Sequence, residues 1–256
     1  MRRKNMKPKV LAIVKSLLVA LIVILFAVTS GFLVSILKIG IPESLYIQAA
    51  FIFLPLVVII LFLLIGKIKK EDLSLVINKN GKDYLYLLPV ILIFIPVLVQ
   101  GFKVQDARYL GGCFLLYLFV GIVEEIYFRG LIPSILKKTF SQNQVIWIST
   151  LVFGIGHIAT SFNGEGPLLT VMTILNALIF GFMAICLLYH TKTIFPLMLI
   201  HFLFDFETKI INLNGTGLAI AEGIRGGLML IYGIILFILL QKKPAVKDEH
   251  ENQQSI

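Results

Sequence analysis

The sequence predicts an all-α membrane protein, a bundle of about eight transmembrane helices. Of its 256 residues, 58% are hydrophobic and only 14% are charged, whereas soluble domains average about 45–50% apolar and about 25% charged residues. Apolar runs long enough to cross a bilayer follow one another along the chain, with lysine-bearing polar segments between them. We therefore expect a single polytopic membrane domain over residues 1–256, without a linker, a repeat or a second domain.

Three early runs each meet the length of about 20 apolar residues that a helix needs to cross a bilayer. They cover residues 16–37, 44–66 and 84–102. The first follows a basic arm and is longer than the roughly 7–15 apolar residues of a signal peptide, so we interpret it as an uncleaved span. Prolines inside the second and third are tolerated where neighbouring helices or waters satisfy the freed carbonyls.

Five further spans complete the predicted bundle. The fourth begins near Tyr109 and ends near Lys137, and the others are expected over residues 141–162, 168–189, 193–206 and roughly 226–240. The seventh is short, and the polar, glycine-bearing stretch before the last makes its limits the least defined. A polar tail over 241–256 follows.

The basic residues predict the orientation of the chain. Most of the 23 lysine and arginine residues fall on one side of the predicted topology, in the N-terminal arm, the loop at 67–83 and the tail. By the positive-inside rule this side is the cytoplasm, so both termini are expected there. The topology accounts for the net charge of +9 without nucleic-acid binding. The lysine-, isoleucine- and leucine-rich composition predicts a bacterial inner-membrane protein.

Ionisable residues interrupt three of the apolar runs, where each costs at least ~2.5–3.5 kcal/mol. They are Glu124, Glu125 and Arg129 in the fourth span, His157 in the fifth, and His201 and Asp205 in the seventh. At a rise of about 1.5 Å per residue, these groups lie at similar heights above the cytoplasmic edge. Side chains from three helices are therefore expected to converge on one site inside the membrane.

Helical geometry separates the two adjacent glutamates. Glu125 and Arg129 are four residues apart with the acid first, which is the favourable order for an ion pair. Glu124 points about 100° away from Glu125 on an α-helix, so it is left without a local partner. Glu124 is therefore the better candidate for a general base. The alternative is a structural network in which all three charges lock helices together.

Three chemistries are compatible with these residues. In the first, Glu124 takes a proton from water that attacks a carbonyl group, and His157 shares the proton transfer. His201 and Asp205 then stabilise the oxyanion. In the second, two histidines and a glutamate bind zinc, although the chain has no HExxH or similarly close ligand spacing. In the third, the groups relay protons or ions in a transporter, although the sequence has no repeated halves.

Three motifs stand in order on successive apolar runs: E-E-x-x-x-R, F-x-x-x-H and H-x-x-x-D. They are formed by Glu124, Glu125 and Arg129, by Phe153 and His157, and by His201 and Asp205. With these motifs, over about residues 109–206, the chain resembles the CPBP family of intramembrane glutamic endopeptidases. This family includes the type II CAAX prenyl proteases and the bacterial Abi bacteriocin-immunity proteins.

The resemblance implies an eight-helix bundle with a cavity open to the cytoplasm and a mechanism that needs no metal or other cofactor. Glu124 would match the glutamate that activates water, His157 its catalytic partner, and His201 with Asp205 the pair at the oxyanion. Glu125, Arg129 and Phe153 would occupy the supporting positions. Asp205 stands where the prenyl proteases carry asparagine, and an aspartate donates a hydrogen bond only when it is protonated.

The expected function is therefore that of an intramembrane endopeptidase that cleaves a membrane-associated or lipidated peptide. Its expected partners are a peptide or membrane-protein substrate and the lipid bilayer, with no nucleic acid. A bacteriocin or pheromone system would supply such a substrate. The alternative is a non-catalytic protein of the same fold, such as a bacteriocin self-immunity factor, whose action would not depend on Glu124.

Overall fold

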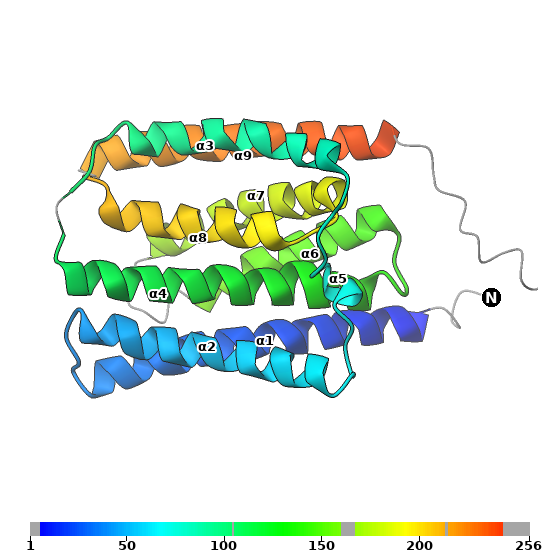
Figure 1. Ribbon diagram of the computed structural model, residues 1–256, viewed down its shortest axis with the longest axis horizontal. Helices are drawn as coiled ribbons and strands as arrows, with labels where there is room; N and C mark the ends of the chain where they lie inside the picture. The colour runs from blue at the N-terminus through cyan, green and yellow to red at the C-terminus, as the bar shows by residue number, and fades with distance from the viewer. Residues whose placement is uncertain (1–5, 104, 160–166, 213–214, 243–256) are drawn as a thin grey trace, which may run out of the picture.

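The computed structural model describes residues 6–103, 105–159, 167–212 and 215–242, which form a bundle of helices (Figure 1). In chain order these are α1 (Met6–Ile36), α2 (Glu43–Leu64), α3 (Leu88–Leu98), α4 (Ala107–Glu124), α5 (Ile132–Leu136), α6 (Gln142–Gly156), α7 (Pro167–Thr191), α8 (Phe195–Ile210) and α9 (Gly215–Lys242). Two 3₁₀ helices, η2 (Glu71–Leu73) and η3 (Gly81–Leu87), precede α3, and a π-helix, η4 (Glu125–Leu131), joins α4 to α5. Within the described ranges, β-structure is limited to one isolated bridge between Phe102 and Ile211.

Six of the described helical segments are long and apolar enough to cross a membrane: Lys7–Ile36, Glu43–Leu64, Gly81–Leu98, Ala107–Leu136, Thr170–Thr191 and Ile220–Lys242. By contrast, α6 and α8 have 15 and 16 residues, fewer than the roughly 17–25 of a typical span. Large apolar side chains cover the outside of the bundle, as expected where lipid replaces water. The predicted all-α membrane bundle is confirmed, and the chain is a multi-pass membrane protein.

The helices lie side by side along the long axis of the molecule (Figure 1). In this view α1 and α2 form one side and α3 and α9 the other, with α4, α6, α7 and α8 between them. Contacts join α2 to α4, α4 to α8, α6 to α7 and α7 to α9. The start of α1 and the end of α9 lie at the same end of the bundle (Figure 1). In this view the three motif-bearing helices, α4, α6 and α8, therefore lie between the two outer pairs (Figure 1).

Local signals fix the starts of these three helices. Asp106 caps α4 by accepting hydrogen bonds from the backbone N–H groups of Arg108 and Tyr109, at 2.9 and 3.1 Å. A capping box formed by Ser141 and Gln144 opens α6. Pro196 lies in the first turn of α8, where its missing N–H has no intrahelical partner to lose.

Three predicted span limits differ clearly from the helices. The first span was expected from residue 16, but α1 begins at Met6. The fifth span was expected over 141–162, but its helix ends at Gly156, and His157 is the C-terminal cap. Two glycines in the last three residues of α6 weaken the helix at this point. Residues 160–162 of the predicted span lie outside the described part of the chain. The last span was expected from about residue 226, but α9 begins at Gly215.

A buried charge network explains the early start of α9. Arg225, expected in a loop, lies within α9 with its side chain 9% exposed. It donates hydrogen bonds to Glu207 of α8 and to Glu222, one turn earlier on α9. The polar residues of segment 207–225 had predicted a loop. These ion pairs compensate the buried charges and allow a helix there. The three-residue spacing of Glu222 and Arg225 was the available sequence signal for a helix there.

Candidate active site

The glutamate motif lies where the fourth span changes from an α-helix to a π-helix. Helix α4 ends at Glu124 and η4 begins at Glu125, and the Ile132 N–H bonds to the carbonyl of Tyr127, five residues earlier. Pro133 gives a local reason, because it has no N–H and its ring crowds the carbonyl four residues before it. The residue spacing had predicted regular α-helix over this segment. π-turns are rare and occur frequently at functional sites.

Glu125 and Arg129 form the predicted ion pair. Arg129 Nη1 donates to Glu125 Oε1 at 2.9 Å, and the side chains of the arginine and the glutamate are 2% and 0% exposed. The guanidinium also lies over the ring of Phe153, with Cζ 3.8 Å from the ring centroid. The arginine is thus held on one side by a carboxylate and on another by an aromatic face. The ion-pair prediction is confirmed.

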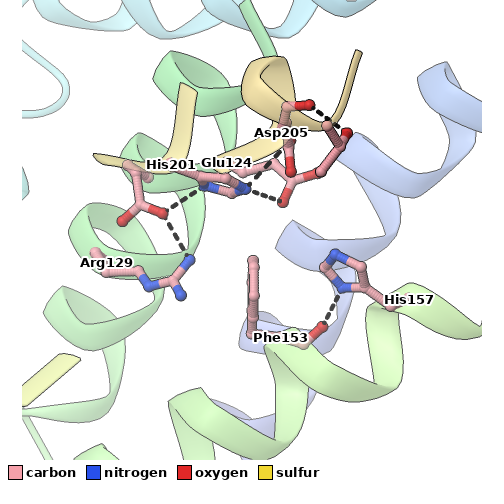
Figure 2. A network of polar contacts seen from close by, with 8 residues as sticks. Glu124, Arg129, Phe153, His157, His201 and Asp205 are labelled. Atoms are coloured by element: carbon pink, nitrogen blue, oxygen red, sulfur yellow. Dashed lines mark hydrogen bonds and ion pairs between the residues drawn. The ribbon is translucent and has the colours of Figure 1, made fainter. Parts of the chain in front are cut away.

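Glu125 also holds His201, which spacing along the chain did not predict. His201 Nδ1 lies 2.7 Å from Glu125 Oε1. An ionised carboxylate only accepts hydrogen bonds, so Nδ1 carries the hydrogen in this contact. Nε2 then faces two other acids, Glu124 Oε2 at 3.8 Å and Asp205 Oδ2 at 3.7 Å. Figure 2 shows the resulting chain from Arg129 through the carboxylate to His201 and on to Glu124 and Asp205.

Glu124 is the acid of the doublet that faces open space. Its side chain is 20% exposed, against 0% for that of Glu125. Its Oε2 is itself buried and has no hydrogen-bond partner among the described residues. It lines a cavity of about 120 Å³ together with His157, Phe128, Gly156 and residues of α1. Roughly 10–15 Å³ of such volume holds one water, so this cavity accommodates several. Glu124 and His157 therefore share a space that water can occupy.

His157 is fixed by its own helix. Its Nδ1 lies 3.0 Å from the carbonyl oxygen of Phe153, one turn earlier. Its ring packs edge-on against that of Phe153, with centroids 4.7 Å apart. Figure 2 shows the ring of Phe153 between Arg129 and His157. Phe153 thus separates the buried ion pair from the cavity while contacting both sides.

Residues 106–206 match the family model described as Rce1-like, type II CAAX prenyl endopeptidase Rce1-like. We call these residues the Rce1-like domain after this similarity. The match runs from the cap of α4 into α8 and contains all three motifs, so the resemblance to the CPBP family is confirmed. At the level of the family, this similarity supports a CAAX-type intramembrane protease. No curated protein sequence matches the chain at a significant level.

Inside the Rce1-like domain, Gly121 lets α4 and α8 approach closely beside the site. A Cβ at this position would lie 2.8 Å from the backbone nitrogen of Phe202 and 2.9 Å from the carbonyl oxygen of Met198. Met198 and Phe202 flank His201 on α8, and Gly121 is one turn before Glu124 and Glu125. Small residues allow such backbone contact between membrane helices. The absence of a side chain at Gly121 therefore sets the distance between the acids and His201.

The side chains of the Rce1-like domain do not assemble a metal site in the described part of the chain. No group of three or more His, Cys, Asp or Glu residues is placed there to hold an ion. The zinc arrangement considered from the sequence thus has no ligand cluster among these residues.

Proposed function

We propose that this protein is an intramembrane endopeptidase in which Glu124 activates water, without a metal ion, to cleave a membrane-associated or lipidated peptide. One observation carries the proposal. Glu124 and His157 line the same cavity, which has room for water. Oε2 of Glu124 also lies 3.8 Å from Nε2 of His201, whose ring Glu125 holds in place. A carboxylate beside water, with two histidines in reach of the reacting atoms, suits peptide hydrolysis by general base catalysis.

In the proposed reaction, Glu124 removes a proton from a water molecule in the cavity while the water oxygen attacks the substrate carbonyl carbon. The carbonyl electron pair moves to its oxygen and forms a tetrahedral oxyanion. The proton then passes to the amide nitrogen, and the C–N bond breaks to give a carboxylic acid and an amine. His157 faces the same cavity and shares this proton transfer, with Nε2 as the exchanging atom because Nδ1 donates to Phe153.

The oxyanion is stabilised by His201 and Asp205 in this proposal. Nδ1 of His201 is fixed by Glu125, which in turn is fixed by Arg129. Nε2 is then directed towards the space next to Glu124 and Asp205. A donor that is already oriented stabilises developing charge without further reorganisation. A protonated Asp205 would contribute a second donor.

The proposed setting is a bacterial inner membrane with both termini in the cytoplasm. The lysine-rich segments support this orientation, and so does the position of the start of α1 and the end of α9 at one end of the bundle (Figure 1). A secreted peptide, a pheromone or a membrane-protein fragment is the proposed substrate class. A bacteriocin system is one such setting.

The test is cleavage by the purified protein in liposomes, with lipidated and membrane-anchored peptides analysed by mass spectrometry. Glu124→Gln and His157→Ala should each abolish cleavage while thermal unfolding stays close to wild type. The exposed Glu71 of η2 supplies the matched control, because Glu71→Gln makes the same change away from the cavity. Equal cleavage by Glu124→Gln and wild type would refute the proposal. A non-catalytic immunity protein would instead keep its protective effect in both site variants.

A further inference from the structure

Helix α7 carries none of the three motifs, yet one of its side chains lies beside two groups of the candidate site. The ring centroid of Phe180 is 4.9 Å from that of the His201 imidazole, and the two ring planes form an angle of 52°. Cζ of Arg129 lies 5.3 Å from the same Phe180 centroid. Phe180 is buried, with 6% exposure. It therefore adjoins both side chains that bind Glu125.

One hydrogen bond does not by itself fix the plane of the His201 ring. Nδ1 lies 2.7 Å from Glu125 Oε1, and the imidazole can still tilt about the line that joins these two atoms, because χ2 of histidine has broad minima. A tilt would carry Nε2 away from the space beside Glu124 and Asp205. A contact against the ring itself is needed to hold its direction.

Two aromatic rings make such contacts with His201. Phe180 is the nearer, at 4.9 Å, and Phe153 lies edge-on at 6.0 Å with an angle of 77° between the planes. Aromatic pairs attract each other in tilted and edge-on arrangements at centroid distances of about 4.5–7 Å. Because Phe180 is about 1 Å closer than Phe153, it restricts the tilt of the imidazole more strongly.

The ring of Phe180 is itself held in place by rings from two other helices. Phe204 of α8 lies 5.4 Å away at an angle of 56°, and Phe153 of α6 lies 6.1 Å away at 42°. Phe204 in turn carries the guanidinium of Arg225, whose Cζ is 4.5 Å from the ring centroid. In such a packed interior Phe180 cannot swing aside unless its neighbours also move.

Phe180 also stabilises the arginine at the other end of the network. Nη2 of Arg129 is buried and has no hydrogen-bond partner among the described residues. The ideal Cβ position of Gly181, the next residue on α7, lies 3.7 Å from this nitrogen, so α7 leaves space for the guanidinium there. The rings of Phe153 and Phe180, with centroids 3.8 and 5.3 Å from Cζ, attract the cation in place of a further hydrogen bond.

We infer that Phe180 is a positioning residue of the candidate site: its ring fixes the tilt of the His201 imidazole and keeps Nε2 directed at the oxyanion. The inference rests on the proposed function and adds to it a residue from a helix without a motif. Phe180 is not among the residues that line the cavity with Glu124 and His157, so it acts through His201. Because the oxyanion exists only after the attack of water, misalignment lowers kcat and leaves KM nearly unchanged.

Phe182 supplies the matched control for Phe180. It lies two residues later on α7 and is also 6% exposed. Its ring stacks on Trp147 of α6, with centroids 5.0 Å apart, and lies 5.8 Å from Phe237 of α9. Phe180→Leu and Phe182→Leu therefore remove the same atoms from the same helix, and both should lower the melting temperature by similar amounts. Only Phe180→Leu removes a ring from His201.

The first measurement does not depend on catalysis. Histidine labelled with ¹³C at Cε1 is incorporated into the full-length protein in liposomes, and solid-state NMR gives the order parameter of the Cε1–H bond of His201. The signal is assigned by its loss in His201→Ala. The order parameter should be lower in Phe180→Leu than in the wild type, and unchanged in Phe182→Leu. Equal order parameters in Phe180→Leu and Phe182→Leu would overturn the inference.

The second measurement is the steady-state cleavage of a lipidated peptide by the same variants. Phe180→Leu should lower kcat by about tenfold with KM within twofold of wild type, whereas Phe182→Leu should keep both constants within twofold. Equal kcat values in the two variants, or a change in KM alone, would contradict the inference while the wild type still cleaves. A mobile His201 in Phe180→Leu without any cleavage by the wild type would support the positioning role and refute the protease proposal.

Discussion

The replacement Gly121→Ala tests whether close contact between α4 and α8 sets the geometry of the site. The added Cβ would lie 2.8 Å from the Phe202 nitrogen, whereas ordinary contact begins at 3.4 Å. Both atoms that it meets on α8 belong to the backbone, so no rotation of a side chain relieves the overlap. The two helices must therefore separate by about 0.6 Å if they respond by simple displacement (the difference between these two distances).

This displacement acts directly on the contacts of His201. The hydrogen bond from His201 Nδ1 to Glu125, now 2.7 Å, would lengthen to about 3.3 Å, just beyond the usual range for such a bond. The distance from Nε2 to Glu124, already 3.8 Å, would grow as well. A misplacement of about 1 Å can cost about 10²-fold in rate, so we expect a loss on the order of tenfold in kcat. Overpacking should also lower the free energy of unfolding by about 1–3 kcal/mol.

The assay is steady-state cleavage of a peptide that the wild-type protein hydrolyses in liposomes, together with thermal unfolding of the same samples. Gly227→Ala is the matched control, because Gly227 lies on the exposed face of α9 with no atom within 4 Å of its ideal Cβ. That variant should keep wild-type kinetics and gain slightly in helix stability. If Gly121→Ala retains kcat within twofold of wild type, the spacing of α4 and α8 does not control the site.

Three further substitutions test individual contacts of the site. Arg129→Met leaves the buried charge of Glu125 uncompensated and should lower the free energy of unfolding by about 3–5 kcal/mol. The double variant that adds Glu125→Gln should recover much of this loss. No recovery would argue against a coupled pair. Phe153→Leu removes the ring between Arg129 and His157 and should lower stability by about 0.5–2 kcal/mol through the lost cation–π contact; an unchanged melting temperature in detergent would contradict that contact. Asp205→Asn supplies a permanent hydrogen-bond donor and should retain or raise kcat, whereas Asp205→Leu should lower kcat. A loss of activity in the asparagine variant would show that Asp205 acts as a carboxylate.

The fold was largely predictable because bilayer thickness imposes a length on each apolar run. Hydropathy and the lysine pattern located the membrane-spanning helices of the bundle. They failed where polarity or helix length was decided by contacts between distant segments. Arg225 reads as a loop residue until Glu207 is placed beside it on α8. Helix α6 ends at Gly156 because two glycines weaken its last turn, and hydropathy does not detect this effect.

The sequence predicted which residues form the candidate site, but not all of the contacts between them. The i,i+4 spacing indicated the pairing of Glu125 with Arg129, because both residues are on one segment. Glu125 also binds His201, and 76 residues separate them, so no periodicity reveals this contact. The π-helix was also missed, although Pro133 was a visible reason for the backbone to widen. These additions give Glu125 a positioning role and leave Glu124 as the acid that faces the cavity.

In the proposed mechanism, Glu124 activates water directly instead of attacking the peptide itself. A single-turnover reaction in H₂¹⁸O, with protein in excess over peptide, tests this most directly. Direct attack by water predicts one ¹⁸O atom in the new carboxyl terminus of the product and none in the protein segment that contains Glu124. Label in the side chain of Glu124, or a first product without ¹⁸O, would contradict the account.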